Sequence, residues 1–335
     1  MAIGEDPARP ERQRVAVIGA GAIGGTMAAL LHAAGHDVTV TARGEHLAAI
    51  RAHGLRLRGG FGALTAPVVA LERLEEAPDV AILAVKATGA AAAIEQNRAA
   101  LDAVPLLVAQ NGLYGEREAA RLLGHDRVAG ALSLIAANSL EPGVVTVTAP
   151  SATVVGGAEA ERFAALLGEV MPVERTPDLE GAQWTKLLIN MVNAIPAIVG
   201  HSVQDVIRDP GLRRVMVASM RECARTGLAS GVRWQPMQGL TPALVRLVAW
   251  APSRIAQQVP LRIRGRLGDV PNLGSTQQSI RRGQPTEVDR INGAVVEAAA
   301  RVGREAPVNA ALVELVHEVE RTGRFAAPSV VRRLA

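Results

Sequence analysis

The first half of the chain alternates short apolar, β-branched runs with alanine-rich stretches of helical length. This alternation is typical of parallel strands that are joined by crossover helices. The runs that we interpret as strands are Arg14–Ile18, Val38–Thr41, Val80–Ala84, Leu106–Ala109, Val128–Ala131, Val144–Thr148 and Thr153–Val155. Helices are expected at Ile23–Ala34 and Glu45–His53, because a glycine that can end a helix follows each stretch.

From about Thr176 the pattern changes to long helical stretches with few strand signals. Thr176 and Pro177 are expected to be the N-cap and first residue of a helix that runs toward Ile198. A second helix is expected at Gly211–Ser230. Residues 231–273 are rich in tryptophan and proline, which predicts a broken helical region or a lid.

These two patterns together predict an α/β fold with two domains. An N-terminal Rossmann-type, doubly wound sheet is expected over residues 1–175, and an all-helical C-terminal domain over residues 176–335. The length of 335 residues and a hydrophobic content of 49% allow a sizeable core. Aromatic residues make up only 2% of the chain, so Ala, Val, Leu and Ile must build that core.

Charge and cysteine content exclude several classes of protein. The formal net charge is only +4, and the chain lacks the clustered basic residues and stacking aromatics of a nucleic-acid surface. The single cysteine, Cys223, can form neither an internal disulfide nor a sulfur-based metal cluster, which suits a reducing cytoplasm. Residues 1–14 lack the apolar core of a signal peptide, and the apolar stretches at 80–94 and 187–200 are too interrupted to span a membrane. We therefore expect a cytoplasmic protein without a metal centre.

A glycine-rich turn follows the first expected strand. The spacing G-x-G-x-x-G is formed by Gly19, Ala20, Gly21, Ala22, Ile23 and Gly24. In this motif the first glycine makes the tight turn, the second lets a pyrophosphate approach the backbone, and the third lets helix and strand pack closely. The turn predicts a dinucleotide site, because the flanking strand and helix stand where the motif needs them.

The end of the second expected strand decides between NAD and NADP. An acidic residue there would bind the ribose 2′-hydroxyl of NAD, whereas an arginine would accommodate the 2′-phosphate of NADP. Arg43 stands at this strand end, while Glu45 suits the first turn of the next helix. NADP is the expected cofactor, with an ordinary exposed arginine as the alternative interpretation of Arg43.

Lysine is scarce in this chain. Only two of its 36 lysine and arginine residues are lysines, Lys86 and Lys186. An ammonium can lose its proton when it is desolvated, which a guanidinium in practice does not do. Lys86 comes shortly after the expected strand Val80–Ala84, and Asn111 comes shortly after the expected strand Leu106–Ala109. Both residues are therefore expected at the carboxyl edge of the sheet, where ligands bind. Chance survival of the lysines and a simple turn at Asn111 are the alternatives.

Three polar residues interrupt a later apolar stretch. Lys186, Asn190 and Asn193 are spaced i, i+4 and i+7, which predicts that they share one helical face. Burial of such groups without partners is costly, so this face should line a polar cleft. A hydrogen-bonded contact between two helices is the alternative.

Taken together, these motifs resemble the ketopantoate reductase (2-dehydropantoate 2-reductase) family. The resemblance covers most of the chain in order and rests on the glycine turn, Arg43, Lys86, Gln110–Gly112, Lys186–Asn193 and Thr286–Gly293. It implies that NADPH reduces a small-molecule 2-keto acid in a cleft between the two domains. Reduction of 2-dehydropantoate to pantoate is the simplest such reaction.

The resemblance also implies roles for individual residues. Lys186 would be the general acid. The implied substrate-binding residues are Asn111, Asn190, Asn193 and Ser275. The implied cofactor-binding residues are the six of the glycine turn, Arg43, Lys86, Asn111, Ala136 and Glu287. Glu287 has an alternative interpretation, because Thr286 and Asp289 are spaced as a capping box in which Glu287 would be the first helical residue.

Two departures from the family pattern concern the substrate. After Ser275 the chain reads Thr276-Gln277-Gln278-Ser279, where the family has an apolar residue and later an aspartate. The family also has an asparagine after the helix that corresponds to Lys186–Asn193. That asparagine is missing here, in the region of Gly200 and His201. A related reductase of a bulkier ketone or imine and a non-catalytic NADPH-binding sensor therefore remain alternatives. The oligomeric state stays open, a homodimer included.

Overall fold

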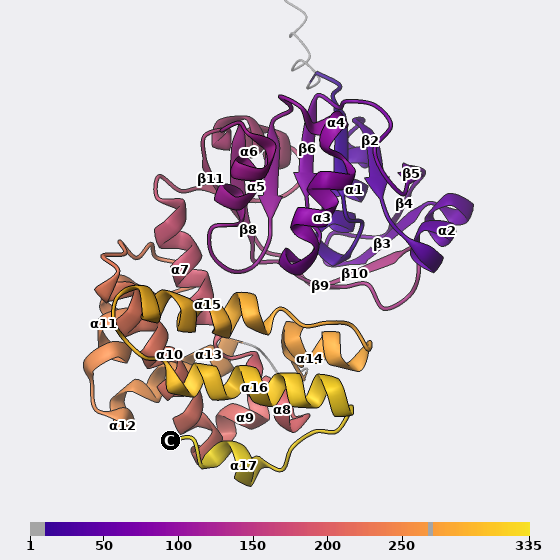
Figure 1. Ribbon diagram of the computed structural model, residues 1–335. Helices are drawn as coiled ribbons and strands as arrows, with labels where there is room; N and C mark the ends of the chain where they lie inside the picture. The colour runs from indigo at the N-terminus through magenta and orange to yellow at the C-terminus, as the bar shows by residue number, and fades with distance from the viewer. Residues whose placement is uncertain (1–10, 267–270) are drawn as a thin grey trace, which may run out of the picture. The chain divides into compact units, whose positions relative to one another are not determined.

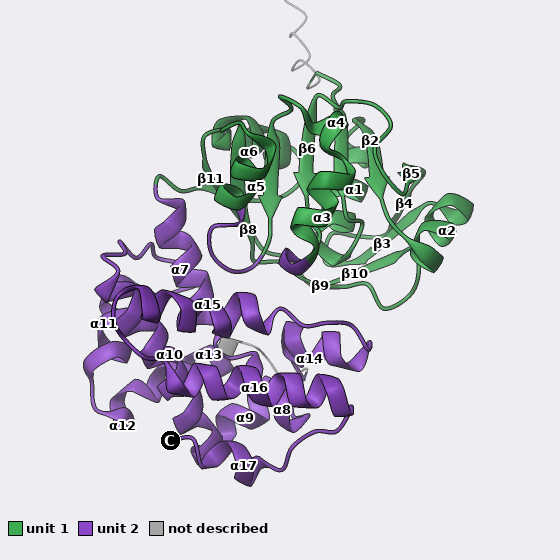
Figure 2. Cartoon of the chain, viewed as in Figure 1, with its two compact units in different colours: residues 1–85, 89–110, 116–177 green, residues 86–88, 111–115, 178–335 purple. Residues whose placement is uncertain are grey.

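The protein forms two compact units, which Figure 2 shows in different colours. The computed structural model describes residues 11–266 and 271–335. The first unit comprises residues 1–85, 89–110 and 116–177. The second unit comprises residues 178–335 and takes in two short segments from the first half of the chain, 86–88 and 111–115. Most of segment 1–14 and residues 267–270 of region 231–273 lie outside the described residues.

An eight-stranded sheet is the centre of the first unit (Figure 1). Its strands, in spatial order, are β12 (Val173–Arg175), β11 (Thr153–Gly157), β8 (Val128–Ser133), β7 (Leu106–Ala109), β6 (Val80–Leu83), β1 (Arg14–Ile18), β2 (Asp37–Thr41) and β5 (Val69–Leu71). Neighbours from β8 to β5 are parallel, whereas β11 pairs antiparallel with β8. Strands β6 and β7 are buried along their whole length, as expected for a parallel sheet covered on both faces.

Helices connect the parallel strands of this sheet. They are α1 (Ala22–Ala33), α2 (Gly44–His53), α3 (Ala90–Gln96), α4 (Arg98–Leu101), α5 (Gly115–Leu123) and α6 (Ala160–Gly168), with a 3-10 turn at Ala87–Gly89. Gly54, with φ of +73°, follows α2 directly, as its place in the sequence predicts. The Rossmann-type fold expected for the first half is confirmed.

A second, four-stranded sheet packs on helix α1. Its order is β4 (Leu64–Ala66), β3 (Leu55–Gly59), β10 (Val144–Ala149) and β9 (Ala136–Asn138). Because α1 contacts β1 and β2 as well as this smaller sheet, it is buried on two sides and has little polar surface. The sequence pattern predicts β10 but neither its partners nor a second sheet.

The described residues of the second unit form helices and connecting loops, with a single β-bridge between Met237 and Leu240. Its helices are α7 (Leu179–Asn190), α8 (Ala194–Val199), α9 (Val203–Arg208), α10 (Pro210–Ala229), α11 (Pro242–Trp250), α12 (Ser253–Ala256), α13 (Gln258–Arg266), α14 (Gly274–Arg281), α15 (Val288–Arg301), α16 (Pro307–Thr322) and α17 (Pro328–Arg332). Helix α10 packs against α7, α9, α11, α15, α16 and α17. The helical C-terminal region is therefore confirmed, and α11 to α13 form the broken helical region expected after residue 231. In the ranges that the structure describes, no helix combines the length and apolar character needed to cross a membrane.

The start and the length of the first helix in this unit differ from the prediction. Thr176 remains at the sheet edge, because its N–H donates to the Val155 carbonyl at 2.9 Å, and Asp178 caps α7 by accepting from the Gly181 N–H at 3.0 Å. The helix ends at Asn190 instead of running to Ile198. Pro196 lies in the first turn of α8, where its missing N–H costs nothing, whereas inside a continuous helix it would break the ladder.

Candidate active site

The turn between β1 and α1 has the geometry that its glycines require. Gly19 has φ of +100°, and a Cβ on it would lie 2.7 Å from the Val85 Cγ1 atom. A Cβ on Gly24 would lie 2.1 Å from the Gly19 carbonyl oxygen, so only glycine allows α1 to pack this closely on the strand. Around Gly21, by contrast, a Cβ would meet no atom within 4 Å. The open side of the turn is therefore at the glycine where a pyrophosphate would approach.

The start of helix α1 also fits a phosphate group. Gly21 is the N-cap residue, and no side chain caps the helix. The N–H groups of a first helical turn and the helix dipole attract an anion. Thr41 holds the turn against β2, because its Oγ1 accepts from the Gly19 N–H at 3.1 Å and its carbonyl accepts from the Ala20 N–H at 3.0 Å. These residues fit the pyrophosphate of a dinucleotide.

Arg43 lies where the sequence placed it, two residues beyond the end of β2. It is the N-cap residue of α2, and its guanidinium is exposed and donates to the Gln96 Oε1 atom. Ala136, the first residue of β9, lies in the smaller sheet, where its carbonyl accepts from the Thr148 hydroxyl at 3.1 Å. Their contacts with a cofactor remain predictions.

Lys186 lies in the last two turns of α7. Burial lowers the pKa of its ammonium from 10.5 to about 8, while the negative charge of Glu287 acts in the opposite direction. Its neighbours Thr185 and Leu187 are buried in the interior of the second unit. The structure therefore places a perturbed lysine close enough to a carboxylate for the two charges to interact.

Glu287 joins two loops that are distant in the sequence. Its Oε1 atom accepts from the Ala87 N–H at 3.3 Å, and its Oε2 atom accepts from the Asn111 Nδ2 at 3.1 Å. Ala87 follows β6 and Asn111 follows β7, and these two strands are parallel neighbours. Glu287 thus holds both loops at the start of α15.

The capping box expected around Glu287 forms only in part, because Thr286 Oγ1 accepts from the Val288 N–H at 3.3 Å while the Thr286 N–H donates to Glu320 and not to Asp289. Glu287 is itself the N-cap residue of α15, and it makes no side-chain capping bond. The Asp289 carboxylate is engaged elsewhere, because it is 2.9 Å from the His317 Nε2 atom. Glu287 is consequently free of a capping role and contacts the two loops instead.

Lys86 is tied to the segment around α14. Its ammonium donates to the Ser279 hydroxyl at 3.0 Å and to the Pro285 carbonyl at 2.7 Å. Burial lowers the pKa of Lys86, and the charge of Glu287 opposes this shift. The hydrogen-bond partners of the Lys86 ammonium are thus protein atoms of the second unit. A contact of Lys86 with a cofactor remains a prediction.

The expected single helical face of Lys186, Asn190 and Asn193 is interrupted. Asn190 is the last residue of α7, and Asn193 is the N-cap residue of α8. The Asn190 Nδ2 atom is buried and finds no hydrogen-bond partner within the described residues. A Cβ on Gly274 would lie 2.7 Å from the Asn193 Oδ1 atom, so Asn193 lies at the start of α14, beside the exposed Ser275.

Two further side chains of this region were not singled out as site residues by the sequence. Gln277 on α14 is fully buried, and neither its Oε1 nor its Nε2 has a hydrogen-bond partner in the described ranges. Tyr114 donates its hydroxyl to the Glu180 Oε1 atom at 3.0 Å and so ties the segment 111–115 to α7. Gln277 could have been found from the sequence, because it stands in the segment that departs from the family pattern. Tyr114 could have been found because it is the only tyrosine of the chain.

Comparison with known proteins identifies the family. Residues 15–160 match the family described as ketopantoate reductase PanE/ApbA, and residues 178–320 match the C-terminal region of the same family. A 2-dehydropantoate 2-reductase of Archaeoglobus fulgidus is 31% identical over 316 residues, which is 92% of this chain and 98% of the relative. One of Mesorhizobium japonicum is 30% identical over 341 residues, which is 91% of this chain and 97% of the relative.

Solved structures agree with these matches. A ketopantoate reductase of the PanE/ApbA family from Ralstonia eutropha superposes with a TM-score of 0.79 at 29% identity, over 92% of this chain and 98% of that one. A D-mandelate dehydrogenase with NADH and anilino(oxo)acetate shares the fold with the same TM-score at 18% identity, over 92% and 99% of the two chains. The resemblance seen in the sequence and the expected oxidoreductase class are thus confirmed, and the chain belongs to the ketopantoate reductase family.

Proposed function

We propose that this protein uses NADPH to reduce a 2-keto acid to a 2-hydroxy acid, with Lys186 as the general acid. Ketopantoate, which would become pantoate, is the simplest substrate, because the relatives are named for that reaction. The observation that carries the proposal is Lys186 itself, a lysine on a largely buried helix whose pKa is lowered to about 8.

The chemistry follows from the state of Lys186. When bound, the cofactor supplies the hydride that reduces the carbonyl carbon. The Lys186 ammonium stabilises the negative charge that develops on the carbonyl oxygen and donates a proton to it, so that a hydroxyl forms. The resulting neutral amine then takes up a proton from water. A pKa of about 8 leaves most of the lysine charged at neutral pH while making it a stronger acid than an ordinary lysine.

Amide and hydroxyl groups near Lys186 would orient the substrate. The unpartnered Nδ2 of Asn190 suits a carboxylate or carbonyl oxygen of a keto acid, because a buried donor without an acceptor is costly. Asn193 and Ser275 both lie at the start of α14, and Glu287 fixes the amide of Asn111. We assign these four residues to substrate binding, with Asn111 also reaching the cofactor.

NADPH is the proposed cofactor rather than NADH. The glycine turn Gly19–Gly24 would bind the pyrophosphate, and Arg43 would bind the 2′-phosphate. Lys86, Ala136 and Glu287 are proposed to complete the cofactor contacts.

The first experiment is steady-state NADPH oxidation with ketopantoate, beside a panel of bulkier 2-keto acids, ketones and imines. Lys186→Met removes the amine but keeps the length of the side chain, and we expect kcat to fall about 10² to 10⁴-fold. Arg321→Ala, on the exposed face of α16, is the control and should change kcat less than twofold. A loss below tenfold in a folded Lys186→Met variant would exclude the general acid.

A reductase of a bulkier ketone or imine is the second candidate. It is favoured by Gln277, a buried amide in the segment after Ser275, where the family has an apolar residue and later an aspartate. Turnover of a panel compound without turnover of ketopantoate would select this candidate. Tight NADPH binding without oxidation by any compound would instead indicate a non-catalytic sensor.

A further inference from the structure

We infer that Arg73 is a second residue for the 2′-phosphate of NADPH, and that Gln96 positions the Arg43 guanidinium beside it. The inference deepens the proposed function and rests on its choice of cofactor. Arg73 follows β5, and no motif in the sequence points to it.

The strand register brings Arg43 and Arg73 to the same place. Thr41 of β2 pairs with Leu71 of β5 in parallel register, and the Ala42 N–H donates to the Leu71 carbonyl at 2.9 Å. Arg43 and Arg73 each stand two residues beyond this pair. Because neighbouring strands are about 4.8 Å apart, the two backbones leave the sheet side by side. This is its carboxyl edge next to β2, where the ribose of a dinucleotide binds.

Helix α3 holds the loop that carries Arg73 on both sides of that residue. The Gln96 Nε2 atom donates to the Glu72 carbonyl at 3.3 Å. The Asn97 Oδ1 atom, directly after α3, accepts from the Leu74 N–H at 2.7 Å. Asn97 is buried and donates in turn to the Ala93 carbonyl at 2.7 Å. The backbone at Arg73 is therefore fixed, while its side chain is exposed.

The same Gln96 amide reaches Arg43. Its Oε1 atom accepts from the Arg43 Nη2, so a single side chain links the guanidinium to the residue before Arg73. An amide oxygen orients the guanidinium without neutralising it. The other N–H groups of Arg43 stay available for a phosphate, which guanidinium groups bind through paired, charge-assisted hydrogen bonds.

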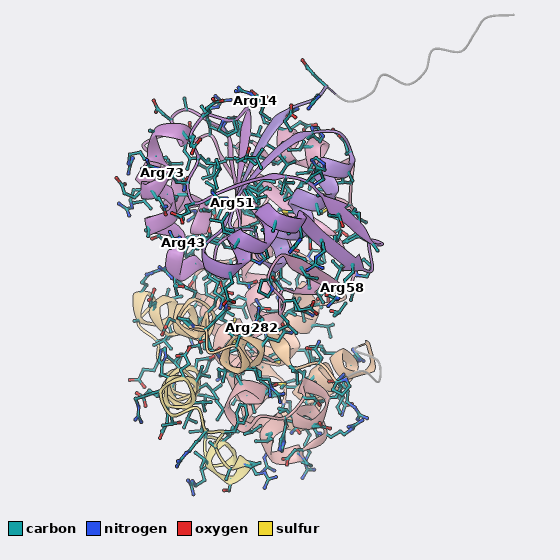
Figure 3. The ribbon with its side chains drawn as sticks, turned by 90° about the vertical axis from the view of Figure 1, so that its right-hand side faces the viewer. Arg14, Arg43, Arg51, Arg58, Arg73 and Arg282 are labelled. Carbon is teal, nitrogen blue, oxygen red and sulfur yellow. The ribbon has the colours of Figure 1, made fainter. Side chains whose placement is uncertain are left out.

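Neither of these two arginines is engaged by a carboxylate within the described residues. Neither Arg43 nor Arg73 is in a salt bridge of the described ranges, and the printed side-chain partner of Arg43 is the neutral Gln96. Figure 3 labels both arginines on the first unit. Most described arginines of this unit have a carboxylate partner, namely Arg12, Arg14, Arg58, Arg98, Arg117, Arg127, Arg162 and Arg175. Arg51 is also near β5, but its Nε donates to the Ala70 carbonyl of that edge strand, which explains it without a ligand. Two guanidinium groups at this edge that form no salt bridge suit a dianion.

The test is direct binding, so that it does not depend on turnover. Dissociation constants for NADPH, NADH and adenosine 2′,5′-bisphosphate are measured by calorimetry for the wild type, Arg43→Ala and Arg73→Ala. We expect Arg73→Ala to weaken NADPH and the bisphosphate about 10- to 100-fold and NADH less than twofold, since a charge-assisted contact is lost. Arg121→Ala is the matched control, because Arg121 is an exposed arginine in the last turn of α5 and should leave all three ligands unchanged.

Gln96→Glu tests the positioning role of Gln96. The substitution keeps the shape of the side chain but places a carboxylate against Arg43, which should compete with the 2′-phosphate. We expect the dissociation constant for NADPH to rise about tenfold or more with little change for NADH, and KM for NADPH to rise likewise while kcat stays nearly constant. Equal effects on NADPH and NADH, or none, would leave Gln96 a structural residue and overturn this part.

The outcomes separate this inference from the proposed function. If Arg43→Ala weakens NADPH selectively and Arg73→Ala does not, the inference about Arg73 fails and the NADPH-dependent function stands. If the wild type binds NADH as tightly as NADPH, the proposed preference for NADPH is wrong, and the inference about Arg73 is wrong as well. Circular dichroism melting curves of each variant show whether it is folded.

Discussion

Lys186 and Glu287 show how two residues 101 positions apart set one chemical property. Burial alone lowers the pKa of the lysine, and the Glu287 carboxylate limits that shift by favouring the charged ammonium. Glu287 is in turn held by the Ala87 N–H and the Asn111 amide. A lysine with this pKa changes its charge within the pH range of an ordinary assay.

The first prediction concerns the pH dependence of catalysis. We expect kcat/KM for reduction to be level below about pH 7 and to fall as the pH rises through about 8, because the neutral amine has no proton to donate. Oxidation of the hydroxy acid should rise over the same range. Glu287→Gln removes the charge that favours the ammonium, so the fall should begin at lower pH.

The matched control for this prediction is Glu297→Gln, an exposed position on the same helix α15, which should leave the pH profile in place. A profile that stays level to pH 10 in the wild type would contradict the assignment of Lys186. A Glu287→Gln profile that moves to higher pH would contradict the coupling of the two charges.

At the scale of elements, the turn between β1 and α1 contains glycines that serve different purposes. Two glycines of one motif differ in what surrounds them. A Cβ on Gly24 would lie 2.1 Å from a backbone oxygen, whereas a Cβ on Gly21 would meet nothing within 4 Å. One glycine is therefore required by packing, and the other leaves room for a ligand.

The second prediction follows from this difference. Gly24→Ala should lower the free energy of unfolding by about 1–3 kcal/mol, since the backbone of the turn has to move. Gly21→Ala should change it by less than about 1 kcal/mol, because the residue has ordinary dihedral angles there, yet should weaken NADPH at least tenfold. Urea unfolding and calorimetric titration measure the two quantities. Equal destabilisation by both substitutions would contradict the assignment of Gly21 to the ligand.

Most of the strands that the sequence pattern does not predict are short. Leu55-Arg56-Leu57-Arg58 alternates apolar and polar residues, and the structure buries both leucines and exposes both arginines in β3. That period of two was a readable signal. Strands β4, β9 and β12 have only three residues each, too few for any periodicity, so pairing with neighbours decides their structure.

At the scale of the whole molecule, the reactivity of the single thiol indicates whether the second unit is folded. Cys223 lies on α10 in the hydrophobic core of that unit, and its side chain is fully buried. Burial raises the pKa of the thiol well above its usual range. Both effects suppress the thiolate that reacts with alkylating and disulfide reagents.

The third prediction is that a thiol reagent leaves the native protein unlabelled for hours and reacts with one equivalent in denaturant. Labelling in native buffer should proceed only through opening of the second unit, so its rate should rise with urea. Cys223→Ala is the control and should show no labelling in either condition. Rapid labelling of the folded wild type would contradict the burial of α10.

Features that depend on residues close together in the chain follow from the amino-acid pattern alone. The alternation of apolar runs and helical stretches was enough for the confirmed fold class, and the glycine spacing was enough for the β1–α1 turn, because periodicity and turn chemistry are local. Which distant groups meet is set by the folded structure. Glu287 contacts Ala87 and Asn111 across 200 and 176 residues, and Gln96 contacts Arg43 across 53. It also placed residues 86–88 and 111–115 in the helical unit and lowered the pKa of Lys186, because burial and charge depend on neighbours that only folding brings together.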